Sequence, residues 1–168
     1  MKIITKILVL TFIVTACGQK ETSHELFLKG QSFYDSENDS MAIITLSKAI
    51  NLDTLNKDAY YLRAYANHRF LQYENAIFDY TKTIELDNKN DEAYYFRGVA
   101  KRNINDIEGA INDYSKAIEI NPKNGEAFNN RGLLKIQSNL IKNGCEDLLS
   151  AKNLGIKEAD TSILIYCK

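Results

Sequence analysis

A small residue recurs every 34 positions along this 168-residue chain, at Ala42, Ala76, Ala110 and Gly144. A repeat of this length predicts stacked supersecondary units that bury one continuous core together. A second set of small residues lies twelve positions earlier in each unit: Gly30, Ala64, Gly98 and Gly132. Two antiparallel helices pack closely only where small side chains let them approach. We therefore expect each unit to be a helix pair in which these two sets of residues face each other.

The phased pattern resembles the tetratricopeptide repeat (TPR), in which large apolar, small and aromatic residues recur at fixed places across 34 residues. The resemblance implies an all-α fold, a TPR-type α-α superhelix (solenoid) of four helix-turn-helix repeats at residues 23–56, 57–90, 91–124 and 125–158. The end of a solenoid needs covering, so residues 159–168 are predicted to form a C-terminal capping helix.

Three arginines each precede an aspartate by sixteen residues. In the first repeat both residue types are replaced together, by Lys29 and Thr45, which suggests that the two side chains meet. We expect a partly buried ion pair with the bidentate geometry that Arg allows. The alternative is that the arginines grip an acidic ligand. The pairs are Arg63 with Asp79, Arg97 with Asp113, and Arg131 with Asp147.

The N-terminus follows different rules from the repeats. Residues 1–6 carry two lysines and no acid, and residues 7–16 are almost wholly apolar, which is typical of a secretory signal. The apolar stretch is short of the roughly 20 residues that a transmembrane helix needs. Val14 to Cys17 resembles the bacterial lipobox, which implies a lipoprotein signal peptide at 1–16, an acylated Cys17 and a lipidated tether at 17–22. An ordinary secretory signal with an incidental cysteine is the alternative.

The residue after the predicted acylation site bears on location. In the lipoprotein family an aspartate there retains the protein at the inner membrane, whereas this chain has Gly18. The resemblance therefore implies a lipid-anchored protein of the bacterial cell envelope, placed at the outer membrane.

Two further cysteines lie near the C-terminus. Cys145 and Cys167 are reflections of each other about residue 156 in the helical hairpin expected there, so they should be neighbours. Export to an oxidising compartment would permit a bridge. We predict a structural disulfide. Two buried thiols are the alternative, and a redox pair is disfavoured because no Cys-X-X-Cys spacing occurs.

Charge and histidine content exclude other classes. The formal net charge is −1 and the basic residues form no run, so no nucleic-acid partner is expected. The two histidines, His24 and His68, lie in no metal-binding or nucleophile-activating motif. We expect no catalytic residues, no cofactor and no metal. An enzyme using repeated acids such as Glu92 and Glu126 is kept as a third hypothesis.

The TPR resemblance places the first helix of every repeat on the inner, concave surface, where ligands of that family usually lie. Aromatic residues and Arg dominate interface energies, and Phe27, Tyr61 and Tyr95 would form an aromatic ladder. For any single tyrosine the alternative is packing against a neighbouring helix. The predicted partner-binding row is Phe27, Gln31, Tyr34, Tyr61, Tyr65, His68, Arg69, Tyr95, Val99, Arg102, Asn129, Leu133 and Ile136.

These observations favour a membrane-anchored TPR scaffold that binds a protein or peptide at the bacterial cell envelope. A glycan or other small ligand in the aromatic groove is the alternative, because tyrosine rings can stack on sugars. The carboxylate clamp of TPR chaperone adaptors needs Lys and Asn in the first unit and basic residues in the third. This chain has Phe27, Gln31, Glu92 and Phe96 there, so the clamp is not expected.

Overall fold

The computed structural model describes residues 20–168, which form nine α-helices and no β-strand. Each 34-residue unit holds one helix pair, and the predicted all-α solenoid is confirmed. The predicted signal peptide, Cys17 and Gly18 lie outside the described residues. The first helices of the pairs are α1 (Ser23–Asp35), α3 (Lys57–Arg69), α5 (Asp91–Asn103) and α7 (Gly125–Gln137). The second helices are α2 (Asp39–Leu52), α4 (Tyr73–Leu86), α6 (Ile107–Ile120) and α8 (Ile141–Asn153), followed by α9 (Glu158–Tyr166).

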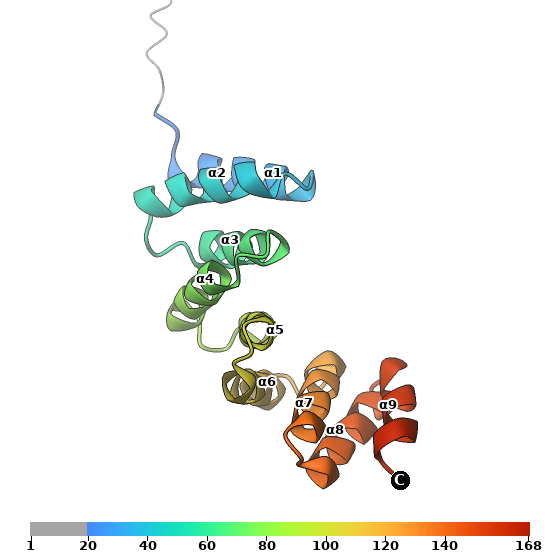
Figure 1. Ribbon diagram of the computed structural model, residues 1–168. Helices are drawn as coiled ribbons and strands as arrows, with labels where there is room; N and C mark the ends of the chain where they lie inside the picture. The colour runs from blue at the N-terminus through green and yellow to red at the C-terminus, as the bar shows by residue number, and fades with distance from the viewer. Residues whose placement is uncertain (1–19) are drawn as a thin grey trace, which may run out of the picture.

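The pairs stack in chain order into a curved array (Figure 1). Every helix contacts its neighbours in the chain, and α1 also contacts α3, as α3 contacts α5. Because the first helices touch across successive units, they lie on the inner side of the curve. Within residues 20–168 no helix is both long and apolar enough to cross a membrane.

Local signals start and end the helices in phase. Asn56, Asn90 and Asn124 each precede a first helix, and their side chains accept hydrogen bonds from backbone amides of the first turn at 2.9, 2.9 and 3.0 Å. Each first helix is followed by a residue with φ near +60° that turns the chain into the second helix. These residues are Glu37, Leu71, Asn105 and Asn139.

The small residues provide the close approach predicted from the sequence. A Cβ added at Gly132 would lie 2.9 Å from the Gly144 carbonyl oxygen, and one added at Gly98 would lie 3.3 Å from that of Ala110. Leu46, Tyr80, Tyr114 and Leu148 fill the space beside these contacts and are fully buried. The predicted structural positions Gly30, Ala42, Ala64, Ala76, Gly98, Ala110, Gly132 and Gly144 are all buried.

The three Arg-Asp pairs have bidentate geometry in the structure. Arg63 Nε donates to Asp79 Oδ2 at 2.8 Å and Nη2 donates to Oδ1 at 2.7 Å. Arg63 Nη1 also donates to Ser47 on the preceding unit at 2.8 Å, so one guanidinium joins α2, α3 and α4. Arg97 and Arg131 repeat this pattern with Asp113 and Thr81 and with Asp147 and Ser115.

The C-terminal helix packs on the last unit. Gly155, with φ +90°, makes the turn before α9, and Ala159 is fully buried against α8. The helix begins one residue before the predicted 159–168 segment and ends at Tyr166. Cys167 leaves the helical conformation and forms a disulfide with Cys145 of α8, with a Cα–Cα distance of 5.7 Å.

Candidate binding surface

Five aromatic side chains from α1, α3 and α5 form a connected group on the inner side of the array. We call Tyr34, Tyr61, Tyr65, Tyr95 and Phe96 the inner aromatic cluster. Tyr65 lies at its centre, with ring centroids 5.7 Å from Tyr34, 6.4 Å from Tyr61 and 4.7 Å from Phe96. Phe96 continues the group to Tyr95 at 5.0 Å. Edge-to-face contacts of this kind stabilise the cluster, and its members are partly exposed.

Two tyrosines of the predicted ladder also link adjacent repeats. The Tyr61 hydroxyl donates to Glu92 Oε2 at 2.9 Å, and the Tyr95 hydroxyl accepts from Asn130 Nδ2 at 3.1 Å. Burial raises the pKa of both hydroxyls, and for Tyr61 the Glu92 carboxylate raises the pKa further. Their hydroxyls therefore hold the array together while their rings contribute to the inner surface.

Arg69 has a structural role that the sequence analysis did not assign to it. Its Nε donates to Asp39 Oδ1 at 3.0 Å, and Nη2 donates to the Tyr34 carbonyl oxygen at 3.1 Å. Its guanidinium carbon lies 4.2 Å from the centroid of the Tyr34 ring. Arg69 thus joins α3 to the first repeat, and its charge is already matched by a carboxylate.

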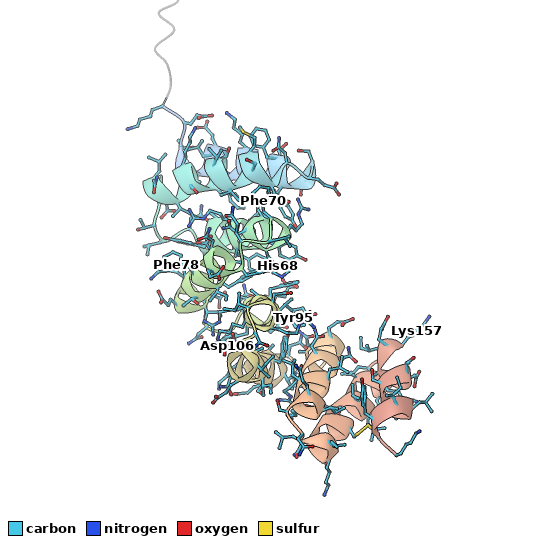
Figure 2. All side chains as sticks on the ribbon, in the orientation of Figure 1. His68, Phe70, Phe78, Tyr95, Asp106 and Lys157 are labelled. Carbon is cyan, nitrogen blue, oxygen red and sulfur yellow. A yellow bond between two sulfur atoms is a disulfide. The ribbon has the colours of Figure 1, made fainter. Side chains whose placement is uncertain are left out.

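Arg102 is a second exposed cation beside the inner aromatic cluster, because Asn130 contacts both Arg102 and Tyr95. Its one hydrogen bond within the described residues is a long contact of 3.4 Å from Nη1 to Asn130 Oδ1. His68 lies near it, half-buried, and no donor or acceptor among the described residues pairs with its buried Nε2 atom. Burial lowers the pKa of His68, and the positive charge of Arg102 lowers it further. His68 and Tyr95 lie on the same side of the helix array (Figure 2).

In the C-terminal part of the predicted row, Asn129 is buried, whereas Leu133 and Ile136 are partly exposed. Asn129 is only 7% exposed, so its side chain offers little surface to a partner. Leu133 and Ile136 pack with Ile163 and Cys167 of the C-terminal segment. The α9 helix therefore packs beside the inner side of α7, where Leu133 and Ile136 stay partly exposed, and the aromatic part of the surface runs along α1, α3 and α5.

The other predicted residues divide between exposed and partly buried sites. Gln31 is exposed on α1, whereas Phe27 packs against the core of the first repeat. Val99 packs against the core around Ala110 and Tyr114. Of these three side chains, Gln31 is therefore the most accessible to a partner.

Sequence reasoning missed Phe96, Glu92 and Asn130 as parts of this surface. Phe96 and Asn130 directly follow the predicted row residues Tyr95 and Asn129, and Glu92 was considered only as a repeated acid and as a clamp position. Phe96 and Asn130 are 34 residues apart and so share one position in the repeat, which was the available signal for these two. Within residues 20–168, no three His, Cys, Asp or Glu side chains are grouped so that they could hold a metal ion.

Comparison with known proteins identifies the repeats. A family model described as tetratricopeptide repeat matches residues 57–90, and one described as TPR repeat matches residues 100–137. This chain is a tetratricopeptide-repeat protein. The search of curated proteins found no match to the TPR chain.

Solved TPR structures share the fold. The crystal structure of MamA is 27% identical, with a TM-score of 0.78, and the match covers 82% of this chain and 81% of MamA. The Arabidopsis OM64 TPR domain is 28% identical, with a TM-score of 0.65 and coverage of 67% and 93%. The first TPR of Spaghetti (RPAP3), solved bound to the HSP90 peptide SRMEEVD, is 26% identical, with a TM-score of 0.66 and coverage of 69% and 92%.

Proposed function

We propose that this TPR protein is an envelope-anchored scaffold that binds an extended segment of a partner protein along α1, α3 and α5. The observation that carries the proposal is the inner aromatic cluster beside Arg102, a cation with one long hydrogen bond among residues 20–168. Partly exposed aromatic rings next to an arginine match the residue types that dominate binding energies at interfaces. The related RPAP3 domain, solved with a bound peptide, supports a peptide as the ligand class.

The chemistry of this surface defines the partner segment. The exposed charge of Arg102 favours an acidic side chain, because a charge-assisted hydrogen bond is stronger than a neutral one. The rings of Tyr34 on α1 and Tyr65 on α3 offer apolar area to residues on one side of that acid. The partner segment is therefore expected to carry an acidic residue with apolar side chains on one side of it.

A pull-down from detergent-solubilised envelope tests the proposed surface. Arg102→Glu reverses the charge on the inner side, and Tyr65→Ala removes the centre of the aromatic cluster. Lys116→Glu makes the same charge reversal at an exposed site on α6 and serves as the control. We expect one defined protein to be captured by the wild type and by Lys116→Glu, and to be lost with Arg102→Glu and Tyr65→Ala.

Two outcomes would contradict this assignment. Equal capture by all four folded proteins would remove the inner surface as the binding site. Retained protein partners with loss of oligosaccharide binding would instead favour the glycan-binding alternative. Circular dichroism of each variant checks that the helix array is intact.

The proposed membrane attachment depends on Cys17. The support is the Val14 to Cys17 lipobox pattern and the six-residue segment 17–22 that leads into α1. More than one acyl chain is needed for stable anchoring. We expect mass spectrometry to find an acylated Cys17 at the mature N-terminus and density-gradient fractionation to place the protein with the outer membrane. Cys17→Ser should release it, whereas the Cys145→Ala/Cys167→Ala control should remain attached.

A further inference from the structure

A pocket lies between the first and second repeats, lined mainly by residues of α2, α3 and α4 and away from the inner aromatic cluster. Its volume is ≈ 240 Å³, which is below the range of about 300–1,000 Å³ usual for drug-sized ligands. The size suits a single side chain or a small molecule. The lining residues used below are Ile43, Ser47, Arg63, Asn67, Phe78 and Asp79.

In the third and fourth repeats the position equivalent to Asn67 holds a lysine. Lys101 Nζ lies 2.9 Å from Asp113 Oδ2, and Lys135 Nζ lies 2.8 Å from Asp147 Oδ2. Each of these aspartates therefore contacts two cations, its arginine and its lysine. In the second repeat the same register position is Asn67, 34 residues before Lys101, and the side chain is shorter and neutral.

This replacement leaves Asp79 with one cation. Asn67 Nδ2 donates to Asp79 Oδ2 at 3.2 Å. A carboxylate only accepts hydrogen bonds, so the Asn67 amide must turn its nitrogen, and not its oxygen, toward Asp79. The Asn67 side chain is 3% exposed, and no donor in the described part of the chain reaches its buried Oδ1. Burial raises the pKa of Asp79 even though Arg63 opposes that effect. The site thus presents two oxygen acceptors in a place that holds an ammonium group elsewhere in the same chain.

The mouth of the pocket is also suited to a cation on an aliphatic stem. Phe78 is 57% exposed, and Figure 2 shows it on the opposite side of the array from His68. An aromatic ring attracts a cation within about 6 Å of its centroid, and Lys82 Nζ already lies 5.8 Å from the Phe78 centroid. Ile43 gives the wall an apolar surface on which methylene groups can pack.

The neighbouring positive charges do not prevent a second cation from binding. Arg63 is held by two hydrogen bonds to Asp79 and one to Ser47. Arg97 and Arg131 make the same bonds in repeats where a lysine also reaches the aspartate.

We propose that this pocket binds a primary ammonium group on an aliphatic stem, as carried by the lysine side chain of a partner protein. The ammonium donates to Asp79 Oδ2 and Asn67 Oδ1, and the stem lies between Ile43 and Phe78. The bound lysine adds the second cation that Lys101 and Lys135 supply to the aspartates of the later repeats. This site is separate from the inner surface, so it does not depend on the function proposed above.

A titration followed by NMR tests the pocket in the full chain. The probe is the capped peptide acetyl-Ala-Lys-Ala-amide, and its Nε-acetylated form is the neutral control. We expect the Asn67 side-chain amide signals to shift with the lysine peptide at millimolar concentrations and to stay unchanged with the acetylated peptide. Equal shifts with both peptides, or no shift with either, would overturn the proposal.

Two variants separate the pocket from a general surface effect. Asn67→Lys supplies the ammonium from the chain itself, and should raise the melting temperature and abolish peptide binding. Asn67→Leu removes the oxygen acceptor without adding charge, and should also abolish binding. For either variant, unchanged peptide affinity would count against the site. Butylamine is titrated as well, because it carries the ammonium group without a peptide backbone. Tighter binding of the lysine peptide than of butylamine indicates that the natural ligand is a protein lysine, and equal affinity indicates a free amine.

Discussion

Arg97 and Asp113 are joined by two parallel hydrogen bonds, from Nε to Oδ2 at 2.9 Å and from Nη2 to Oδ1 at 2.7 Å. Arg97→Met leaves a buried carboxylate without this partner and should lower the free energy of unfolding by about 3 kcal/mol. Arg63→Met should cost more, because Lys101 still contacts Asp113 whereas Asp79 has no lysine. Urea unfolding measures both. An Arg102→Met control at an exposed site should unfold like the wild type.

Losing the Cys145–Cys167 disulfide should weaken the C-terminal end. The bond closes a loop with a sequence separation of 22 residues, and a loop of this size contributes about 3 kcal/mol in the chain-entropy description. In Cys145→Ala/Cys167→Ala we expect hydrogen exchange to accelerate in α9 and α8 first. Unchanged protection of α9 in this variant would show that packing around Ala159 alone holds the helix.

A methyl group at Gly144 should be destabilising. Gly to Ala in an exposed helix interior usually stabilises by about 1 kcal/mol, but a Cβ here would meet the Gly132 carbonyl oxygen at 2.6 Å. Overpacking of this kind costs about 2 kcal/mol, so the sign should reverse for Gly144→Ala. Thermal unfolding checks it against Asn143→Ala, which changes an exposed neighbour on the same helix.

Leu71 offers a stabilising substitution. It has φ +59° and is 70% exposed, so its side chain contributes little burial while its backbone is in the left-handed region. That region costs an ordinary residue about 1 kcal/mol, and Asn tolerates it better. Leu71→Asn should therefore raise the urea midpoint. Asn105→Leu makes the opposite exchange at the equivalent turn and should lower it.

Stability should also depend on pH through His68. Burial lowers its pKa below the usual value of 6.5, so the unfolded chain takes up a proton more readily than the folded chain. The contribution of His68 to the free energy of unfolding is therefore complete above its usual pKa and is lost as the pH falls through the lowered pKa of the folded state. Urea midpoints measured from about pH 8 to about pH 5 should fall, with a smaller fall for His68→Asn. A His24→Asn control at an exposed site should retain the wild-type response.

The repeat architecture was predictable because its signals recur in phase. Small residues at one interval fixed the helix pairs, and the joint replacement of Arg and Asp in the first repeat indicated their contact. Arg69 could not be placed in the same way. Its partner Asp39 belongs to the previous repeat, and the equivalent positions of the other repeats carry no such pair.

The surroundings of the C-terminal part of the inner surface were unpredictable for a different reason. Asn129, Leu133 and Ile136 have the same register as residues that line the inner side in other repeats. The contacts of Leu133 and Ile136 depend on where α9 packs after the turn at Gly155, and this packing occurs once in the described chain. A periodic pattern carries no information on an element that does not repeat.

The junctions between successive units are made by equivalent hydrogen bonds. Each arginine that closes a unit reaches back to a hydroxyl at the same register of the preceding unit, at Ser47, Thr81 or Ser115. A gene duplication or deletion of one whole 34-residue unit would therefore join chains whose contacts already match. The array is free to change length during evolution in steps of one repeat, and the inner surface would lengthen or shorten with it.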